Sequence, residues 1–169
     1  MAEDSERSEG LEMPGESEGL EGPLAPEEIT SDSPFTLPGF FDALADGRLL
    51  AGRCTDCGTH LIPPRPACYD CGSRAVGIEE QPQTGTVVSY TAVYRPPSPF
   101  ADLAPVTVAV VELDSGARLT GRVTATLADT EIGSGVELRV RDPVEVGIDP
   151  EMHLSYEEEW PVHEFDLLE

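Results

Sequence analysis

The sequence predicts a mainly β protein in which a short helix and a small metal-binding ribbon precede a five-stranded barrel. Three observations support this fold class. All four cysteines lie between positions 54 and 71. Short runs of β-branched and aromatic residues, separated by Gly, Pro and Asp, follow from position 84 onward. Both ends of the chain are strongly acidic and poor in large apolar residues, so we expect disordered tails there.

The cysteines form two C-x-x-C-G motifs, Cys54 with Cys57 and Cys68 with Cys71. Two thiolates three positions apart can point at one ion, and the following glycine lets the backbone turn toward the sulfurs. Four soft ligands suit a tetrahedral zinc ion with no open coordination position, so its expected role is structural. Pairing within a motif would give strained disulfide rings, and a doubled motif is unusual for a redox site. Rubredoxin-type iron remains an alternative.

The segment before the first motif predicts a short helix over residues 38–47. Phe40, Phe41 and Leu44 share one face, and Gly47 provides the stop. Such a short helix is not stable alone, so its apolar face must dock on the rest of the domain or on another protein. Residues 49–53 should then lead into the first cysteine motif as an extended segment.

After position 84 the pattern changes to strands. Residues 118–127 alternate between apolar and polar side chains, as in a half-buried strand. Gly121 within that run indicates a bend or bulge. Short antiparallel-capable strands without a long helix favour a small Greek-key barrel of the five-stranded OB type. The predicted strands cover residues 85–95, 106–113, 118–127, 136–140 and 144–148.

These patterns divide the chain into five parts. We expect a rubredoxin-like zinc ribbon in the middle and an OB-fold after it, with a helical segment before them and an acidic tail at each end. Trp160 and Phe165 would allow part of the second tail to dock. The expected boundaries are 1–33 for the first tail, 34–52 for the helical segment, 53–80 for the ribbon, 81–148 for the OB-fold and 149–169 for the second tail.

Charge restricts the function. The net charge is −23, most of it in the two tails, and all ten basic residues are arginine. A GC-rich genome would favour arginine, but the acid excess favours adaptation to a high-salt (halophilic) cytoplasm. Nucleic-acid phosphates would be repelled. The first residues lack the pattern of a signal peptide, and no apolar run is long enough to span a bilayer, so we expect a cytoplasmic protein with reduced thiols.

Several motifs together resemble the DUF35 family of zinc-ribbon and OB-fold proteins. The likeness covers about residues 37–147. Each motif is common alone, but their combination is specific. They are Arg53-Cys54-x-x-Cys57-Gly58, Pro63-Pro64-Arg65, Cys68-x-x-Cys71-Gly72-Ser73 and Gly85-x-Val87-Val88-Ser89-Tyr90-Thr91.

The resemblance implies a non-catalytic accessory or scaffold subunit. Family members look like partners of thiolases and related acyl-CoA enzymes, and one archaeal member bridges a thiolase and HMG-CoA synthase around a shared CoA site. The residues agree with this, because His60, His153 and His163 are scattered and form no catalytic group. His60 follows Cys57 closely, but four cysteines already close a zinc site. The alternative is an OB-fold and zinc-ribbon nucleic-acid-binding module, which the negative charge disfavours.

A CoA-binding groove would need arginines near apolar or aromatic surface. The candidates are Arg65, Arg95, Arg118 and Arg122. Arg118 and Arg122 should lie on one face of the same strand. A solvated barrel face, on which these arginines balance nearby carboxylates, is the alternative interpretation.

Overall fold

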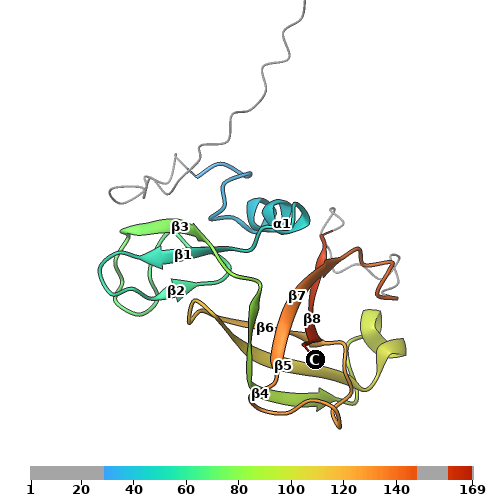
Figure 1. Ribbon diagram of the computed structural model, residues 1–169. Helices are drawn as coiled ribbons and strands as arrows, with labels where there is room; N and C mark the ends of the chain where they lie inside the picture. Colours follow the sequence, from blue (N-terminus) through green and yellow to red (C-terminus); the bar gives the residue numbers. More distant parts are fainter. Residues whose placement is uncertain (1–28, 148–159, 169) are drawn as a thin grey trace, which may run out of the picture.

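The computed structural model describes residues 29–147 and 160–168. One helix precedes a small three-stranded sheet, and a closed barrel follows it (Figure 1). Of the two predicted tails, 1–33 and 149–169, residues 1–28, 149–159 and 169 lie outside the described residues. The elements are α1 (Leu37–Ala45), β1 (Leu50–Cys54), β2 (His60–Leu61), β3 (Val76–Glu80), β4 (Thr84–Val93), the 3₁₀ helix η2 (Ser98–Leu103), β5 (Val106–Leu113), β6 (Arg118–Val123), β7 (Gly135–Arg141) and β8 (Val162–Leu167).

Helix α1 spans Leu37–Ala45, close to the predicted range of 38–47. Thr36 is the N-cap, and its hydroxyl accepts a hydrogen bond from the Gly39 N–H at 3.3 Å. Gly47 follows the helix with a φ of 78°, a conformation that glycine adopts without steric cost. Phe40 and Leu44 are buried, so the helix packs its apolar face against the rest of the domain.

The ribbon is a three-stranded antiparallel sheet with the strand order β2-β1-β3. The central strand β1 pairs with β2 through Gly52 and Arg53, and with β3 along its whole length. Gly52 faces the Cγ1 of Val76 so closely that a Cβ would lie 2.9 Å from it. The sheet therefore positions the first cysteine motif at the end of β1.

The barrel closes in the order β4-β5-β6-β8-β7, with β7 pairing back to β4. All neighbouring pairs are antiparallel except β6 and β8, which run in parallel. The irregularity in the ladder lies between Val87 and Ser89 on β4, where the register shifts. At Gly121 the β5–β6 register is continuous, so no bulge interrupts the pairing there. A Cβ at Gly121 would lie 2.8 Å from the Phe165 ring, which explains the glycine.

The fifth barrel strand is β8, and the sequence pattern misplaced it. Residues 144–148 were expected to form this strand, but 143–147 form turns. Residues 162–167 were expected to belong to an acidic tail, but they pair with both β6 and β7. The acidic composition hid the strand, because Glu164 is buried beside arginines rather than exposed as in a tail.

One hydrophobic core joins the helix and the barrel, and Ile62 of the ribbon packs against it. Phe40, Leu44 and Leu49 belong to the same buried cluster as the inward-facing barrel residues. A polar contact supports this junction, because the Gln81 N–H donates to the Leu49 carbonyl at 2.8 Å. In Figure 1 the helix lies above the place where the ribbon sheet meets the barrel. The barrel members of the cluster are Val87, Ala109, Val111, Leu113, Ala117, Leu119, Val123, Val136, Leu138 and Phe165.

Candidate functional site

The four cysteines converge as the two motifs predict. Their Sγ atoms all lie within 4.8 Å of one another. The Sγ–Sγ distances are 3.6 Å for Cys54–Cys71 and for Cys57–Cys68, too long for a disulfide bond, and all four thiols are free. This cross-pairing, with one cysteine from each motif in each close pair, is the arrangement of four ligands around a single ion.

The two glycines after the motifs make the necessary turns. Gly58 and Gly72 have φ angles of 78° and 75°. Their N–H groups donate to the carbonyls of Cys54 at 2.9 Å and of Cys68 at 3.1 Å. Each motif therefore forms a tight turn in a left-handed conformation that favours glycine.

The thiols differ in environment. Cys54 and Cys68 are buried, whereas Cys57 and Cys71 are exposed. Hydrogen bonds from the Thr59 side chain and backbone lower the pKa of Cys57 to about 6. A backbone hydrogen bond from Ser73 lowers the pKa of Cys71, but the neighbouring Cys57 and Cys54 thiols outweigh it and raise the value to about 12. Four clustered thiols thus resist ionising together unless a cation is present, which fits a thiolate-liganded metal.

The surroundings of the cluster are polar. The Thr59 hydroxyl lies 3.2 Å from the Cys57 Sγ and 3.3 Å from an Asp70 carboxylate oxygen. His60 is not part of the four-cysteine group, and its Nε2 lies 3.8 Å from a Glu79 carboxylate oxygen. The structure thus agrees with a ligand set of cysteines alone.

The four candidate arginines are not brought together. Arg118 donates from Nε and Nη2 to one Glu112 carboxylate oxygen, at 3.0 and 2.9 Å. The Nη2 of Arg122 lies 3.1 Å from the buried Glu164. Arg65 and Arg95 are exposed, and neither forms an ion pair within the described part of the chain.

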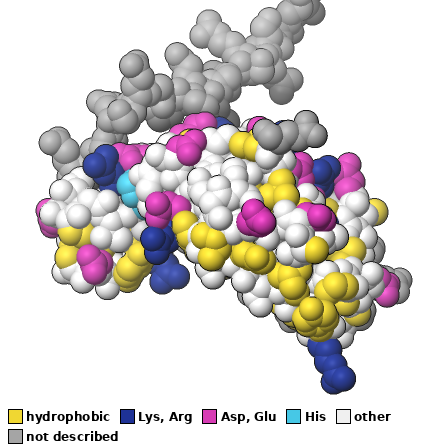
Figure 2. Space-filling view, turned by 60° about the horizontal axis from the view of Figure 1, so that its bottom comes forward, with side chains coloured by type: hydrophobic (Ala, Val, Ile, Leu, Met, Phe, Trp, Pro, Cys, Tyr) yellow, Lys and Arg dark blue, Asp and Glu magenta, His cyan; other side chains and the backbone are white. Residues whose placement is uncertain are grey.

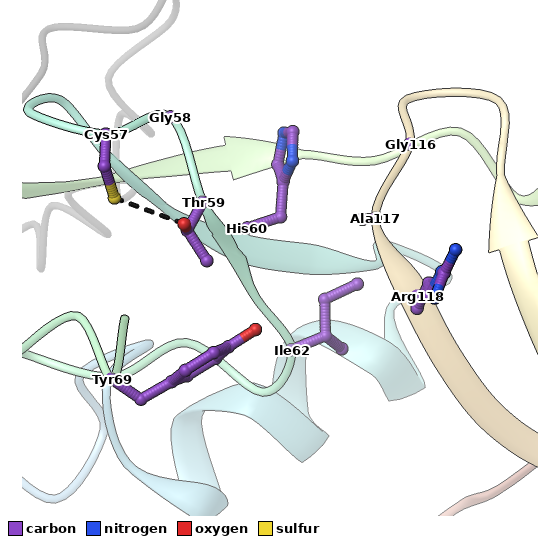
Figure 3. A pocket seen from close by; sticks show the side chains of 9 residues that line it. All are labelled: Cys57, Gly58, Thr59, His60, Ile62, Tyr69, Gly116, Ala117 and Arg118. Carbon is purple, nitrogen blue, oxygen red and sulfur yellow. Dashed lines mark hydrogen bonds between the residues drawn. The ribbon is translucent and has the colours of Figure 1, made fainter. Parts of the chain in front are cut away.

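One polar cleft of about 440 Å³ lies at the junction of the ribbon and the barrel. Figure 3 shows Cys57, Thr59 and Tyr69 of the ribbon on one side and Arg118 of the barrel on the other. Tyr69 is 71% exposed. The cleft thus contains one of the four candidate arginines, on the side opposite an exposed aromatic ring.

A second cavity of about 470 Å³ lies between α1, β5, β6, β8 and the proline-rich turn after β4. Its walls are mainly aliphatic and aromatic, including Phe41, Phe100 and Val108. Arg122 lines this cavity, whereas Arg65 and Arg95 line neither cleft. Sequence reasoning missed the cavity. The only signal was the run Pro96-Pro97 followed by Phe100, because the other walls come from strands far apart in the chain.

Hydrophobic side chains are also present on the outside of the molecule. In Figure 2 they gather over the barrel, with acidic and arginine side chains scattered around them. Within the residues that the structure describes, no helix is long and apolar enough to cross a membrane.

Family models match both parts of the structured region. The ChsH2 rubredoxin-like zinc ribbon domain matches residues 41–77, and the ChsH2 C-terminal OB-fold domain matches residues 79–141. These matches confirm the predicted ribbon and OB-fold. The OB-fold match ends before β8, so the strand that closes the barrel lies outside it.

Relatives agree with the family models. A DUF35 domain-containing scaffold protein of Methanothermobacter thermautotrophicus is 36% identical over 104 residues, which cover 60% of this chain and 77% of the relative. A probable enoyl-CoA hydratase alpha subunit of Thermomonospora curvata is 39% identical over 100 residues, which cover 59% of this chain but only 31% of that protein.

A solved structure of the Ltp2-ChsH2(DUF35) aldolase is similar with a TM-score of 0.58 and 32% sequence identity. The match covers 76% of this chain and 91% of the compared chain. The resemblance seen in the cysteine motifs is thereby confirmed across the ribbon and the barrel. The chain belongs to the DUF35 family of scaffold proteins, with a ChsH2-type zinc ribbon and OB-fold.

Proposed function

We propose that this chain is a non-catalytic accessory subunit that associates with a thiolase or a related acyl-CoA enzyme. The observation that carries the proposal is the similarity to DUF35 scaffold proteins, together with the likeness to a chain of the Ltp2-ChsH2(DUF35) aldolase. A bridge between a thiolase and HMG-CoA synthase is the specific form that the family resemblance favours. The enoyl-CoA hydratase relative supports the wider class of acyl-CoA enzymes.

The proposed metal is one structural zinc ion held by Cys54, Cys57, Cys68 and Cys71. The closeness of the four sulfurs and the glycine turns support this assignment. Four thiolates fill a tetrahedral zinc site and leave no position for a substrate, so the ion would stabilise the fold. Because α1 and Leu49 share the barrel core, the ribbon would hold the helix and barrel in one arrangement.

The four candidate arginines are not equally suited to contact CoA. Arg118 and Arg122 already form ion pairs with carboxylates, so binding a phosphate would require them to give up an existing partner. Arg65 and Arg95 are exposed and have no carboxylate partner among the described residues. We infer that Arg65 and Arg95 are better suited to the phosphates of CoA, with the carboxylate-bound pair in a structural role.

Co-expression tests the proposed function. This chain would be produced together with a thiolase from a neighbouring gene, with and without an HMG-CoA synthase. We expect the chains to elute as one complex in high salt and thiolase output to fall when this chain is omitted. Separate elution together with unchanged thiolase output would rule out the scaffold role.

Nucleic-acid binding by the OB-fold is the second candidate function. It would need a basic groove with exposed aromatic rings. Many arginines of the ribbon and barrel bond to carboxylates instead, including Arg48, Arg53, Arg118 and Arg139. A gel-shift titration with single-stranded DNA at low salt separates the two functions, because only a nucleic-acid-binding protein would retard the DNA.

A further inference from the structure

We propose that the apolar cavity between α1, β5, β6 and β8 binds an uncharged hydrocarbon group with at most one hydrogen-bonding atom. The cavity measures about 470 Å³, within the range of roughly 300–1,000 Å³ typical of small-molecule sites. All of its walls come from this chain, so the inference goes beyond the proposed partnership and does not depend on it.

The one cation among the cavity's lining residues is Arg122, and its charge is already balanced. Its Nη2 lies 3.1 Å from Glu164, which is only 2% exposed and also bonds to Arg141. These residues belong to a network of three arginines and three carboxylates, so the network is neutral. An anionic group entering the cavity would find no uncompensated positive charge. The network consists of Arg122, Arg139, Arg141, Glu137, Glu164 and Asp166.

The imidazole in the cavity wall is also engaged. His163 Nε2 lies 2.9 Å from the Thr120 carbonyl oxygen. Because a carbonyl only accepts hydrogen bonds, Nε2 is the donor, which satisfies this ring nitrogen within the protein. Thr120 is exposed and its hydroxyl, in contrast, has no hydrogen-bond partner among the described residues. It is therefore the natural contact for a single alcohol or carbonyl oxygen of a ligand.

These features define the ligand by chemical class. Aliphatic and aromatic walls favour alkyl chains or hydrocarbon rings, because their burial removes apolar surface from water. A carboxylate or an ammonium group would lose its hydration without gaining a counter-ion. At the same chain length, a neutral ligand should therefore bind more tightly than a charged one. Affinity should also rise as the hydrocarbon lengthens.

Three probes with the same chain test this inference on the full-length protein: 1-octanol, octanoate and octylammonium. Trp160 provides the signal, since it is the only tryptophan and stacks on Phe41 of the cavity wall at 4.5 Å. Titrations followed by Trp160 fluorescence and by calorimetry should show saturable binding of 1-octanol. Octanoate and octylammonium should bind at least tenfold more weakly. Comparison with 1-butanol and 1-hexanol should show affinity rising with chain length.

A matched pair of variants locates the binding. Val108 and Val110 are both half-buried on β5, but only Val108 lines the cavity. V108F should fill the cavity and weaken 1-octanol binding at least tenfold, whereas V110F should bind like the wild type. Circular dichroism melting curves establish that both variants are folded. Equal binding by the two folded variants, absence of saturable binding to the wild type, or equal affinity for octanol and octanoate would each overturn the inference. If V108F does not fold, the comparison of the three probes on the wild type still decides it.

Discussion

Arg122 on β6 lies 3.1 Å from Glu164 on β8, and the two residues are direct register partners where these strands run in parallel. The carboxylate also accepts a bond from Arg141 on β7. Glu164 thus connects the last strand to both of its neighbours. An acidic residue that seemed typical of a solvated tail is a buried part of the barrel seam.

Glu164→Gln should destabilise the protein strongly. Removing the buried carboxylate leaves Arg122 and Arg141, whose side chains are 23% and 40% exposed, without this counter-charge. The loss should therefore be about 1.5–3 kcal/mol, as for a hydrogen bond to a charged group, and below the roughly 3–5 kcal/mol of a fully buried pair. Urea unfolding followed by circular dichroism measures the loss. Glu112→Gln is the control, because its pair with Arg118 is exposed and should be worth about 1 kcal/mol or less. Similar losses for the two variants would contradict a special role for Glu164.

Phe165→Ala should reduce the free energy of unfolding by about 3–5 kcal/mol, as for other large-to-small changes in a core. Phe165 is fully buried in the shared core, although it follows the predicted boundary of the barrel. Leu168→Ala is the control, since Leu168 is 49% exposed just after β8. Thermal melting of both variants tests the assignment of β8, and a wild-type melting temperature for Phe165→Ala would exclude it.

Gly121→Ala tests the packing of the Phe165 ring against β6. The added Cβ would lie 2.8 Å from a ring carbon, so the ring or the strand must move, which should cost about 1–3 kcal/mol. At Gly135 the same change places the Cβ at 3.6 Å from Leu168, an ordinary contact. Denaturant unfolding should therefore separate the two alanine variants. If Gly135→Ala were the more damaging change, steric exclusion at Gly121 would not be the reason for the glycine.

Cys68→Ser should abolish zinc binding and lower the melting temperature of the whole domain. The physical reason is that zinc binding to thiolates contributes directly to folding, and Ile62 of the ribbon packs against the barrel core. Elemental analysis of the purified protein gives the metal content, and calorimetric scans give the stability. A chelator should have the same effect on the wild type.

His60→Ala is the control for the metal, because His60 lies outside the four-cysteine group. This variant should retain one zinc ion per chain. A folded Cys68→Ser protein that melts like the wild type and still assembles with its partner would refute the structural role of the metal. If elemental analysis found iron in place of zinc in the native protein, the four cysteine ligands would stand but the proposed metal would be wrong.

The features that depend on local chemistry were predictable from the sequence. The spacing of the cysteines and their glycines predicted the ribbon, because a C-x-x-C-G motif can make its turn without distant contacts. The apolar pattern around Phe40 and the stop at Gly47 predicted helix α1, and β-branched runs predicted four of the five barrel strands. The family resemblance rested on these same local motifs.

The remaining features depend on which segments meet in space. Side-chain alternation cannot reveal that Glu164 is buried, because its arginine partners come from β6 and β7. For the same reason Arg122 could be placed on a strand face but not assigned its carboxylate. The apolar cavity likewise draws its walls from the helix, four strands and the segments that connect them. Local sequence thus determined the metal motif and most elements, whereas tertiary packing decided the closing strand, the role of each arginine and the cavity.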